Sequence, residues 1–331
     1  MRKIRKILVA VKNTRLKSSP AIRKAAVLAR ALGARLELFH VISEPVAIEL
    51  LTLSNQGLQQ FEAAEKARHT KRLEAIAARL AAGGLNVATA VEWDYPVHEA
   101  LIRRASRTHA DLIVAERHVG KHIAPWFLRY ADWELLRRSP VPVLVVKNAR
   151  NYESPTVLAA VDPSHAFAKT SSLDKEILGI AANVSAATGG QLHAVHAYVP
   201  TIIGMKPAEL NTPDASARIA RRAETLARSR MASAMRAISK LQIASPVCHL
   251  VARHAVNAIP ELARKLACDI VVMGAISRSG LKRVIIGNTA ERLLDELPCD
   301  LLIVKPPVFA SRVPTRSRGS QIVTLMPPSV L

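Results

Sequence analysis

The chain repeats its own alternation of strands and helices, and this internal repeat constrains the fold more than any other feature. Asp111 opens a short apolar run in the first half, and Asp269 opens the matching run 158 residues later. The same offset pairs Pro140 with Pro298. Apolar strand runs that alternate with helical periodicity predict an α/β fold, with a mostly parallel sheet and helices on both faces in each half.

Length and local composition indicate where the two domains begin and end. A chain of 331 residues is long enough for two cores. The polar stretch 148–155 is typical of a linker, so we expect one domain in residues 1–150 and a second in 151–307. Residues 308–331 are rich in Pro, Ser and Arg and lack periodicity, which predicts a disordered basic tail.

Hydrophobic periodicity predicts the same order of elements in both halves. In the first half we expect strands at 7–11, 36–41, 87–93, 111–115 and 141–147, and helices at 20–32, 61–82, 97–108 and 131–138. In the second half we expect strands at 157–161, 191–198, 247–252, 270–273 and 301–305, and helices at 173–188, 214–240, 256–267 and 289–297.

Only the second half keeps glycines at the motif positions of the loop after its fourth predicted strand, whereas the first half has Glu116 and Arg129 there. Gly274 and Ser277 stand at the start of this loop, and nine residues separate Ser277 from Gly287, Asn288 and Thr289. Glycine allows backbone amides to approach a phosphate, and helix N-termini favour anions. The second half is therefore the candidate nucleotide-binding half.

These motifs resemble the universal stress protein family. The strand 157–161 followed by Asp162, the loop 274–291 and the closing strand 299–305 are similar to its first strand, phosphate loop G-x2-G-x9-G-[S/T] and last strand. The resemblance covers residues 5–307 as two copies and is strongest to tandem members of the E type. It implies an adenine nucleotide alpha hydrolase-like fold with five strands in each sheet, and binding of ATP with Mg²⁺ in some members.

The resemblance also implies roles for individual residues. Asp162 corresponds to the residue that meets adenine, and Ala197 to a valine that contacts the base. The loop would hold phosphate through Gly274, Ser277, Gly287, Asn288 and Thr289. Two positions depart from the family pattern, because Ser277 replaces its second glycine and Asn288 its Ser/Thr. A serine still offers an amide and a hydroxyl to phosphate.

The first half lacks these groups, and we expect no nucleotide site there. Lys12 stands where the second half has Asp162, and Glu116 where it has Gly274. A carboxylate would repel a phosphate. The segment 125–133 carries four aromatic residues, which we expect to fill the vacated volume; an aromatic ligand cage is the alternative. His40 and His196 stand at matching points of the repeat, and a structural role is favoured over ligand binding.

The net charge limits the kinds of partner that we expect, and the cysteine content limits the expected cell compartment. The net charge of +21 favours polyanions, such as nucleic acid or an anionic membrane, and the basic helix 214–240 could contact them. No DNA-binding motif accompanies the charge, so a solvated basic surface is the favoured interpretation. Three cysteines without paired spacing predict neither a disulfide nor a metal site, and with no signal or membrane segment we expect a cytoplasmic protein.

No catalytic motif is present, so we predict a non-enzymatic stress or regulatory protein that binds ATP or another small ligand in its second domain. A weak ATP hydrolase and a structural adaptor with an apolar ligand are the alternatives. The resemblance further implies an internal pseudo-dimer, in which 141–146 lies near 301–304. A homodimer of the whole chain stays open.

Overall fold

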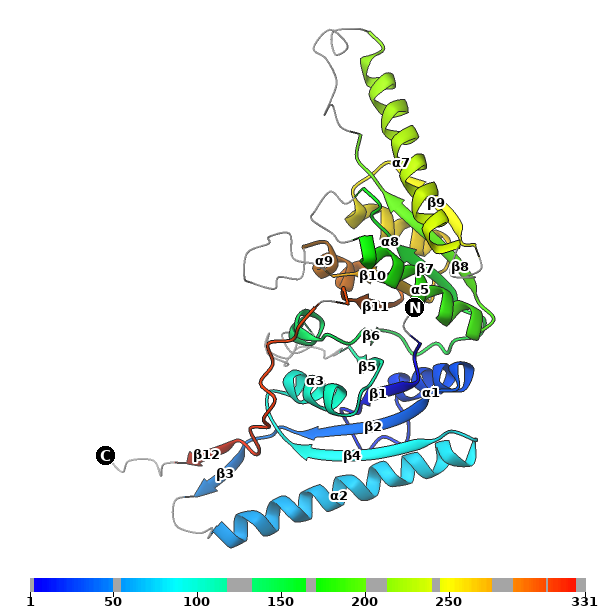
Figure 1. The fold of residues 1–331 in the computed structure, drawn as a ribbon. Helices are drawn as coiled ribbons and strands as arrows, with labels where there is room; N and C mark the ends of the chain where they lie inside the picture. The colour runs from blue at the N-terminus through cyan, green and yellow to red at the C-terminus, as the bar shows by residue number, and fades with distance from the viewer. Residues whose placement is uncertain are drawn as a thin grey trace, which may run out of the picture. The chain divides into compact units, whose positions relative to one another are not determined.

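The computed structural model describes residues 3–49, 55–117, 133–164, 171–200, 213–239, 245–275, 288–307 and 309–325. The chain forms two compact units. The first domain comprises Ile4–Asn151 together with the C-terminal segment that starts at Ala310, and the second domain comprises Tyr152–Phe309. Figure 1 labels the helices and strands of both.

The first domain contains a five-stranded parallel sheet in the order β4-β2-β1-β5-β6. Its strands are β1 (Lys6–Ala10), β2 (Arg35–Ile42), β4 (Val87–Trp93), β5 (Leu112–Glu116) and β6 (Val143–Val146). Its helices include α1 (Pro20–Leu32), α2 (Asn55–Ala82) and α3 (Val97–Arg107), and residues 133–138 are helical as well. Helix α1 begins after the Ser19 cap and ends at Gly33, whose φ of 62° suits glycine.

The second domain repeats this arrangement in the order β11-β10-β7-β8-β9. Its strands are β7 (Thr156–Ala160), β8 (Gln191–Ala197), β9 (Val247–Val251), β10 (Ile270–Gly274) and β11 (Asp300–Val304). Its helices are α5 (Ser171–Ala187), α7 (Ala215–Ser239), α8 (Ala255–Lys265) and α9 (Asn288–Glu296). Helix α5 contacts α7, and α8 contacts α9. The predicted α/β class with two five-stranded domains is confirmed.

The two aspartates that begin the sequence repeat have the same structural task. Asp111 Oδ2 accepts hydrogen bonds from the backbone N–H groups of Arg5 (2.8 Å) and Lys6 (3.1 Å) at the start of β1. Asp269 Oδ2 accepts one from Thr156 N–H (2.9 Å) at the start of β7. Each aspartate stands directly before a strand, β5 or β10, and its hydrogen bonds join the start of that strand to the first strand of its domain.

The C-terminal segment differs from the predicted disordered tail. Strand β12 (Ile322–Leu325) pairs in parallel with the short β3 (Val46–Glu49), as Figure 1 shows. Arg318 Nη2 donates to Glu99 Oε2 (3.0 Å), and Arg318 N–H donates to Asp94 Oδ1 (2.9 Å). Composition suggested a solvated basic segment, but its arginine reaches carboxylates that lie buried in the first domain.

None of the helices in the described ranges is both long and apolar enough to cross a membrane.

Candidate functional site

Three predicted site residues converge at one edge of the second domain's sheet. In this sheet β8 and β9 follow β7 on one side, whereas β10 and β11 lie on the other, so the strand order reverses between β7 and β10. Asp162 follows β7, Gly274 ends β10 and Ala197 ends β8. Parallel pairing aligns Ala160 with Met273, which brings these strand ends together. Open α/β sheets bind ligands at this kind of position.

The side chain of Asp162 is oriented by local hydrogen bonds. Ser164 donates to Asp162 Oδ1 through its backbone N–H (3.2 Å) and through its hydroxyl. The Asp162 N–H donates in turn to Oδ1 of Asp174, a buried residue of α5, at 3.2 Å. In the described part of the chain, Asp162 Oδ2 has no hydrogen-bond donor. This oxygen is available as an acceptor for a ligand.

Gly274 has a structural reason to be glycine that does not involve phosphate. A Cβ atom at this position would lie 2.6 Å from Leu173 Cδ2 and 3.2 Å from Ile177 Cδ1. Both residues belong to α5, so a side chain at this position would collide with them and force their side chains to move. The glycine that sequence reasoning assigned to a phosphate loop therefore also lies where α5 leaves little room for a side chain.

The remaining loop residues are described only in part. Ser277 and Gly287 lie outside the described residues. Asn288 and Thr289 begin α9, and the description there is limited to the backbone. The N-terminus of a helix offers unpaired N–H groups and a partial positive charge, which favour an anion. The predicted phosphate position therefore coincides with a helix start.

His196 lies in β8 and is almost fully buried. Burial lowers its pKa, while the negative charge of Asp162 acts in the opposite direction; the net shift is downward. Its ring stacks on Tyr198 with the centroids 6.1 Å apart. The imidazole is therefore neutral at pH 7.

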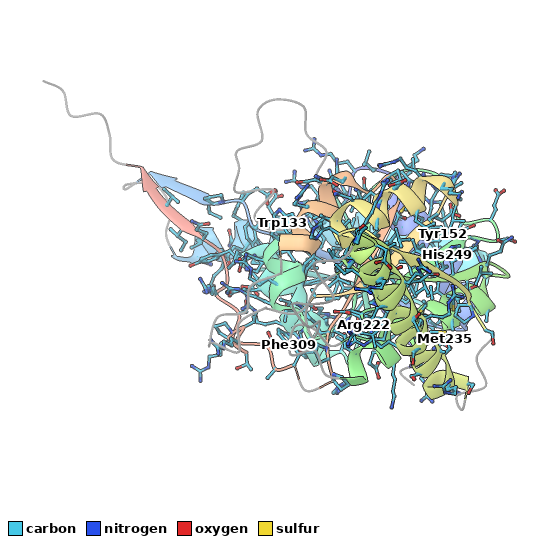
Figure 2. The ribbon with its side chains drawn as sticks, turned by 90° about the horizontal axis from the view of Figure 1, so that it is seen from above. Trp133, Tyr152, Arg222, Met235, His249 and Phe309 are labelled. Carbon is cyan, nitrogen blue, oxygen red and sulfur yellow. The ribbon has the colours of Figure 1, made fainter. Side chains whose placement is uncertain are left out.

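The matching positions of the first domain carry different chemistry. Lys12 follows β1 where Asp162 follows β7, and Glu116 ends β5 where Gly274 ends β10. His40 Nδ1 lies 2.7 Å from the Val11 carbonyl and donates to it, as expected for a structural histidine. Most of the aromatic segment 125–133 lies outside the described residues. Trp133, which Figure 2 labels, is described and is half-buried.

A cavity that sequence reasoning missed lies in the first domain. Its volume is about 700 Å³, and it is lined by the segment after β1, the segment from the end of β2 to β3, one face of α2, and Trp93 at the end of β4. One signal in the sequence could have revealed it. The α2 residues that line the cavity are spaced by three and four, as on a helix face, yet they are mostly polar: Phe61, Glu65, Arg68, His69 and Arg72.

Helix α7 presents the basic face that the sequence predicted. Arg222, which Figure 2 labels together with Met235 on this helix, is exposed. Arg228 pairs with Glu224 at 2.8 Å, one helical turn away, and both side chains are largely in solvent. Such exposed pairs contribute little to stability.

Comparison with known proteins agrees with the repeat and with the fold. The family model described as "Universal stress protein family" matches residues 3–147 and 155–305. Universal stress protein E of Salmonella typhi is 29% identical over 301 residues, which cover 89% of this chain and 92% of that protein. Universal stress protein E of Escherichia coli K12 is 28% identical over the same length.

Solved structures show the same architecture over nearly the whole chain. A protein of unknown function from Pseudomonas aeruginosa PAO1 superposes with a TM-score of 0.69 at 24% identity, covering 92% of this chain and 94% of that one. A universal stress protein from Archaeoglobus fulgidus superposes with a TM-score of 0.56 at 20% identity, covering 91% and 98%. At these identities the likeness concerns the fold.

Proposed function

Because the chain belongs to the universal stress protein family, with one copy of the family domain in each half, we propose that it is a non-enzymatic regulatory protein whose second domain binds ATP with Mg²⁺. The site would lie at the sheet edge formed by Asp162, Ala197 and Gly274. We further propose that the protein acts in the cytoplasm. A homodimer of the whole chain is compatible with this function.

One observation carries the proposal: the acceptor oxygen Asp162 Oδ2 lies at the switch point of the second domain's sheet. Adenine has an exocyclic amine that donates hydrogen bonds, and a carboxylate oxygen is a strong acceptor for it. Ala197 is small and half-buried at the end of the neighbouring strand, which leaves room for a base. Asp162 would therefore select the base.

The phosphates would lie at the start of α9. The backbone N–H groups at Asn288 and Thr289 belong to the first turn of this helix. Sequence reasoning adds Ser277 and Gly287 from the loop that precedes it. The sequence contains no catalytic motif, so we expect no steady turnover of ATP; phosphate release at several molecules per second that is lost in Asp162→Ala would identify a hydrolase instead.

Calorimetric titration of the full-length protein with ATP and MgCl₂ tests this function. Asp162→Asn keeps the shape of the side chain and an oxygen for Ser164, but it replaces the second acceptor with an NH₂ group that faces the amine of adenine. We expect ATP to bind at least about tenfold more weakly to this variant, as for the loss of a charge-assisted hydrogen bond.

The control is Asp214→Asn, because Asp214 lies in solvent beside α7 and its substitution changes the net charge equally. Gly274 is unsuitable for the test, since any side chain there collides with Leu173. Equal binding of ATP by Asp162→Asn and the wild type would contradict the assigned role. No binding by the wild type would contradict the function.

A structural adaptor that holds a non-nucleotide ligand is the second candidate. The observation that favours it is the packing of α5 against Gly274, which explains this glycine without a phosphate. Mass spectrometry of small molecules released from the purified protein by denaturation separates the two functions. ATP or ADP in stoichiometric amount supports the nucleotide site, whereas a different, apolar molecule supports the adaptor.

A further inference from the structure

The cavity of the first domain is lined mainly by charged and aromatic side chains. It lies beyond the carboxyl ends of β1, β2 and β4, and α2 forms one wall. A volume of about 700 Å³ is within the range of small-molecule sites, which hold drug-sized ligands. All the lining residues belong to this domain, so the cavity is independent of the nucleotide site proposed above.

Cations outnumber carboxylates in the wall. The lining includes four basic residues, Lys12, Arg15, Arg68 and Arg72, and two acidic ones, Glu44 and Glu65. Arg68 is already paired with Glu65. Within the described ranges, no carboxylate lies within ion-pair distance of Arg15 or Arg72, although the charge of Glu65 also acts on Arg72, so the lining carries an excess of positive charge. An anion is the ligand that this charge favours.

The histidines of the cavity add hydrogen-bonding groups but little charge. His40 and His69 stack with their ring centroids 4.4 Å apart. His69 Nδ1 lies 2.8 Å from the Thr14 hydroxyl. Burial lowers the pKa of both histidines, and for His69 the neighbouring His40 and Arg72 lower it further. The excess charge at neutral pH is therefore that of lysine and arginine.

The cavity also offers an apolar surface. Phe61 and Trp93 contribute aromatic rings whose centroids are 6.4 Å apart, and Ile42 and Val46 contribute aliphatic groups. The Trp93 indole is fixed because its Nε1–H donates to the Glu62 carbonyl at 3.1 Å. A rigid ring face is a favourable contact for a flat apolar group.

The C-terminal segment holds this wall in place. The Val46 N–H donates to the Gln321 carbonyl at 2.7 Å. The Ser320 hydroxyl donates to the carboxylate of Glu62, the residue whose carbonyl binds Trp93. These contacts link residues more than 200 positions apart, so the cavity is a built feature of the domain rather than a gap between loops.

We propose that this cavity binds a small organic anion that carries an aromatic ring. The acidic group pairs with Arg15 and Arg72 at one side, and the ring packs against Phe61 and Trp93. At the strand end, Lys12 stands where the second domain has Asp162, and a lysine cannot accept a hydrogen bond from the exocyclic amine of adenine. The two domains thus bind ligands of different chemistry on the same fold.

Two matched fluorescent probes test the proposal on the full-length protein. The first is 8-anilinonaphthalene-1-sulfonate, which has an aromatic body and a negative charge; the second is N-phenyl-1-naphthylamine, which has the aromatic body without the charge. We expect the anion to bind with a stoichiometry near one and the neutral probe to bind at least about tenfold more weakly, as for the loss of a charge-assisted contact.

Charge substitutions locate the site. The double variant Arg15→Gln and Arg72→Gln should weaken binding of the anionic probe by about tenfold or more and leave the neutral probe unchanged. The control Arg221→Gln and Arg222→Gln removes the same charge from exposed positions on α7 and should bind the anionic probe like the wild type. Arg15→Gln alone, at an exposed position, repeats the test if the double variant does not fold.

Three results would overturn the proposal: no binding of the anionic probe, equal affinity for both probes, or equal weakening in the α7 control. Asp162→Asn separates this site from the nucleotide site. It should reduce binding of ATP but not of the anionic probe, so either proposal can fail while the other stands. Loss of probe binding in Asp162→Asn would assign the probe to the second domain and contradict the cavity as its site.

Discussion

Arg103 joins the C-terminal segment to the interior of the first domain, and its replacement by methionine should destabilise that domain. The side chain is 6% exposed. It donates to Asp94 Oδ2 from Nε (2.9 Å) and Nη2 (2.7 Å), to Glu99 Oε2 (3.3 Å), and to the Pro314 carbonyl (3.2 Å). Methionine keeps much of the volume but removes the charge and every donor.

The contacts that Asp94 and Glu99 keep in Arg103→Met determine how much stability the domain loses. Removing one partner of a buried ion pair costs about 3–5 kcal/mol, because the other charge stays buried. Asp94 Oδ2 loses both arginine bonds, but Asp94 Oδ1 keeps the N–H groups of Tyr95 and Arg318. Glu99 keeps Arg138 and Arg318. The loss should therefore lie near the lower end, at about 3 kcal/mol.

Tryptophan fluorescence measures this domain selectively. The chain has three tryptophans, Trp93, Trp126 and Trp133, and all three lie in the first half. Urea unfolding followed by this signal should give a lower midpoint for Arg103→Met with an unchanged slope. The control is Arg107→Met on the same helix, because Arg107 is 55% exposed and its ion pair with Glu92 should contribute less than about 1 kcal/mol. An Arg103→Met midpoint within error of that of Arg107→Met would refute the reasoning.

Two further predictions concern buried groups elsewhere. His98 in α3 is buried and its pKa is lowered to about 4, chiefly by burial. The unfolded chain binds a proton at this residue near pH 6.5, so its contribution to stability is complete above that pH and is lost as the pH falls towards 4. The stability of His98→Leu should lack the corresponding change, roughly 3 kcal/mol, in urea unfolding at successive pH values; parallel pH curves for variant and wild type would contradict this. In the second domain, the Tyr152 hydroxyl donates to the fully buried Asp300 at 2.5 Å. Tyr152→Phe should cost about 2 kcal/mol, seen as faster hydrogen exchange in β7 and β11 with unchanged tryptophan-detected unfolding; a shift of the tryptophan signal instead would show that the effect lies in the first domain.

Local patterns in the sequence were sufficient for most of the architecture. The helix 20–32 agrees with α1, and the strand 87–93 agrees with β4, because a proline, a glycine and a change of periodicity mark their ends. Strand β3 was not predicted, since four residues give too short a pattern. Strand β12 was not predicted either, and its partner strand, β3, is far away in the sequence.

The part of the candidate nucleotide site that lies at the ends of strands could be predicted from the sequence. Gly274 was identified from the spacing of the glycine loop, and Asp162 and Ala197 from the family resemblance. The parallel sheet brings them to one edge because the carboxyl ends of its strands coincide. The sequence could not show that Gly274 faces Leu173, since this contact depends on how closely α5 approaches β10.

The sequence by itself determined the two domains and the order of most strands and helices, because these follow from periodicity within short segments, and its motifs carry the resemblance to the family. Only the tertiary structure determined that the C-terminal segment packs on the first domain and that this domain contains a cavity. Arg318 finds Asp94 more than 200 residues away, and the polar stripe of α2 faces Lys12 and Trp93 across the same space. Such features depend on which distant side chains meet, and no local pattern encodes that.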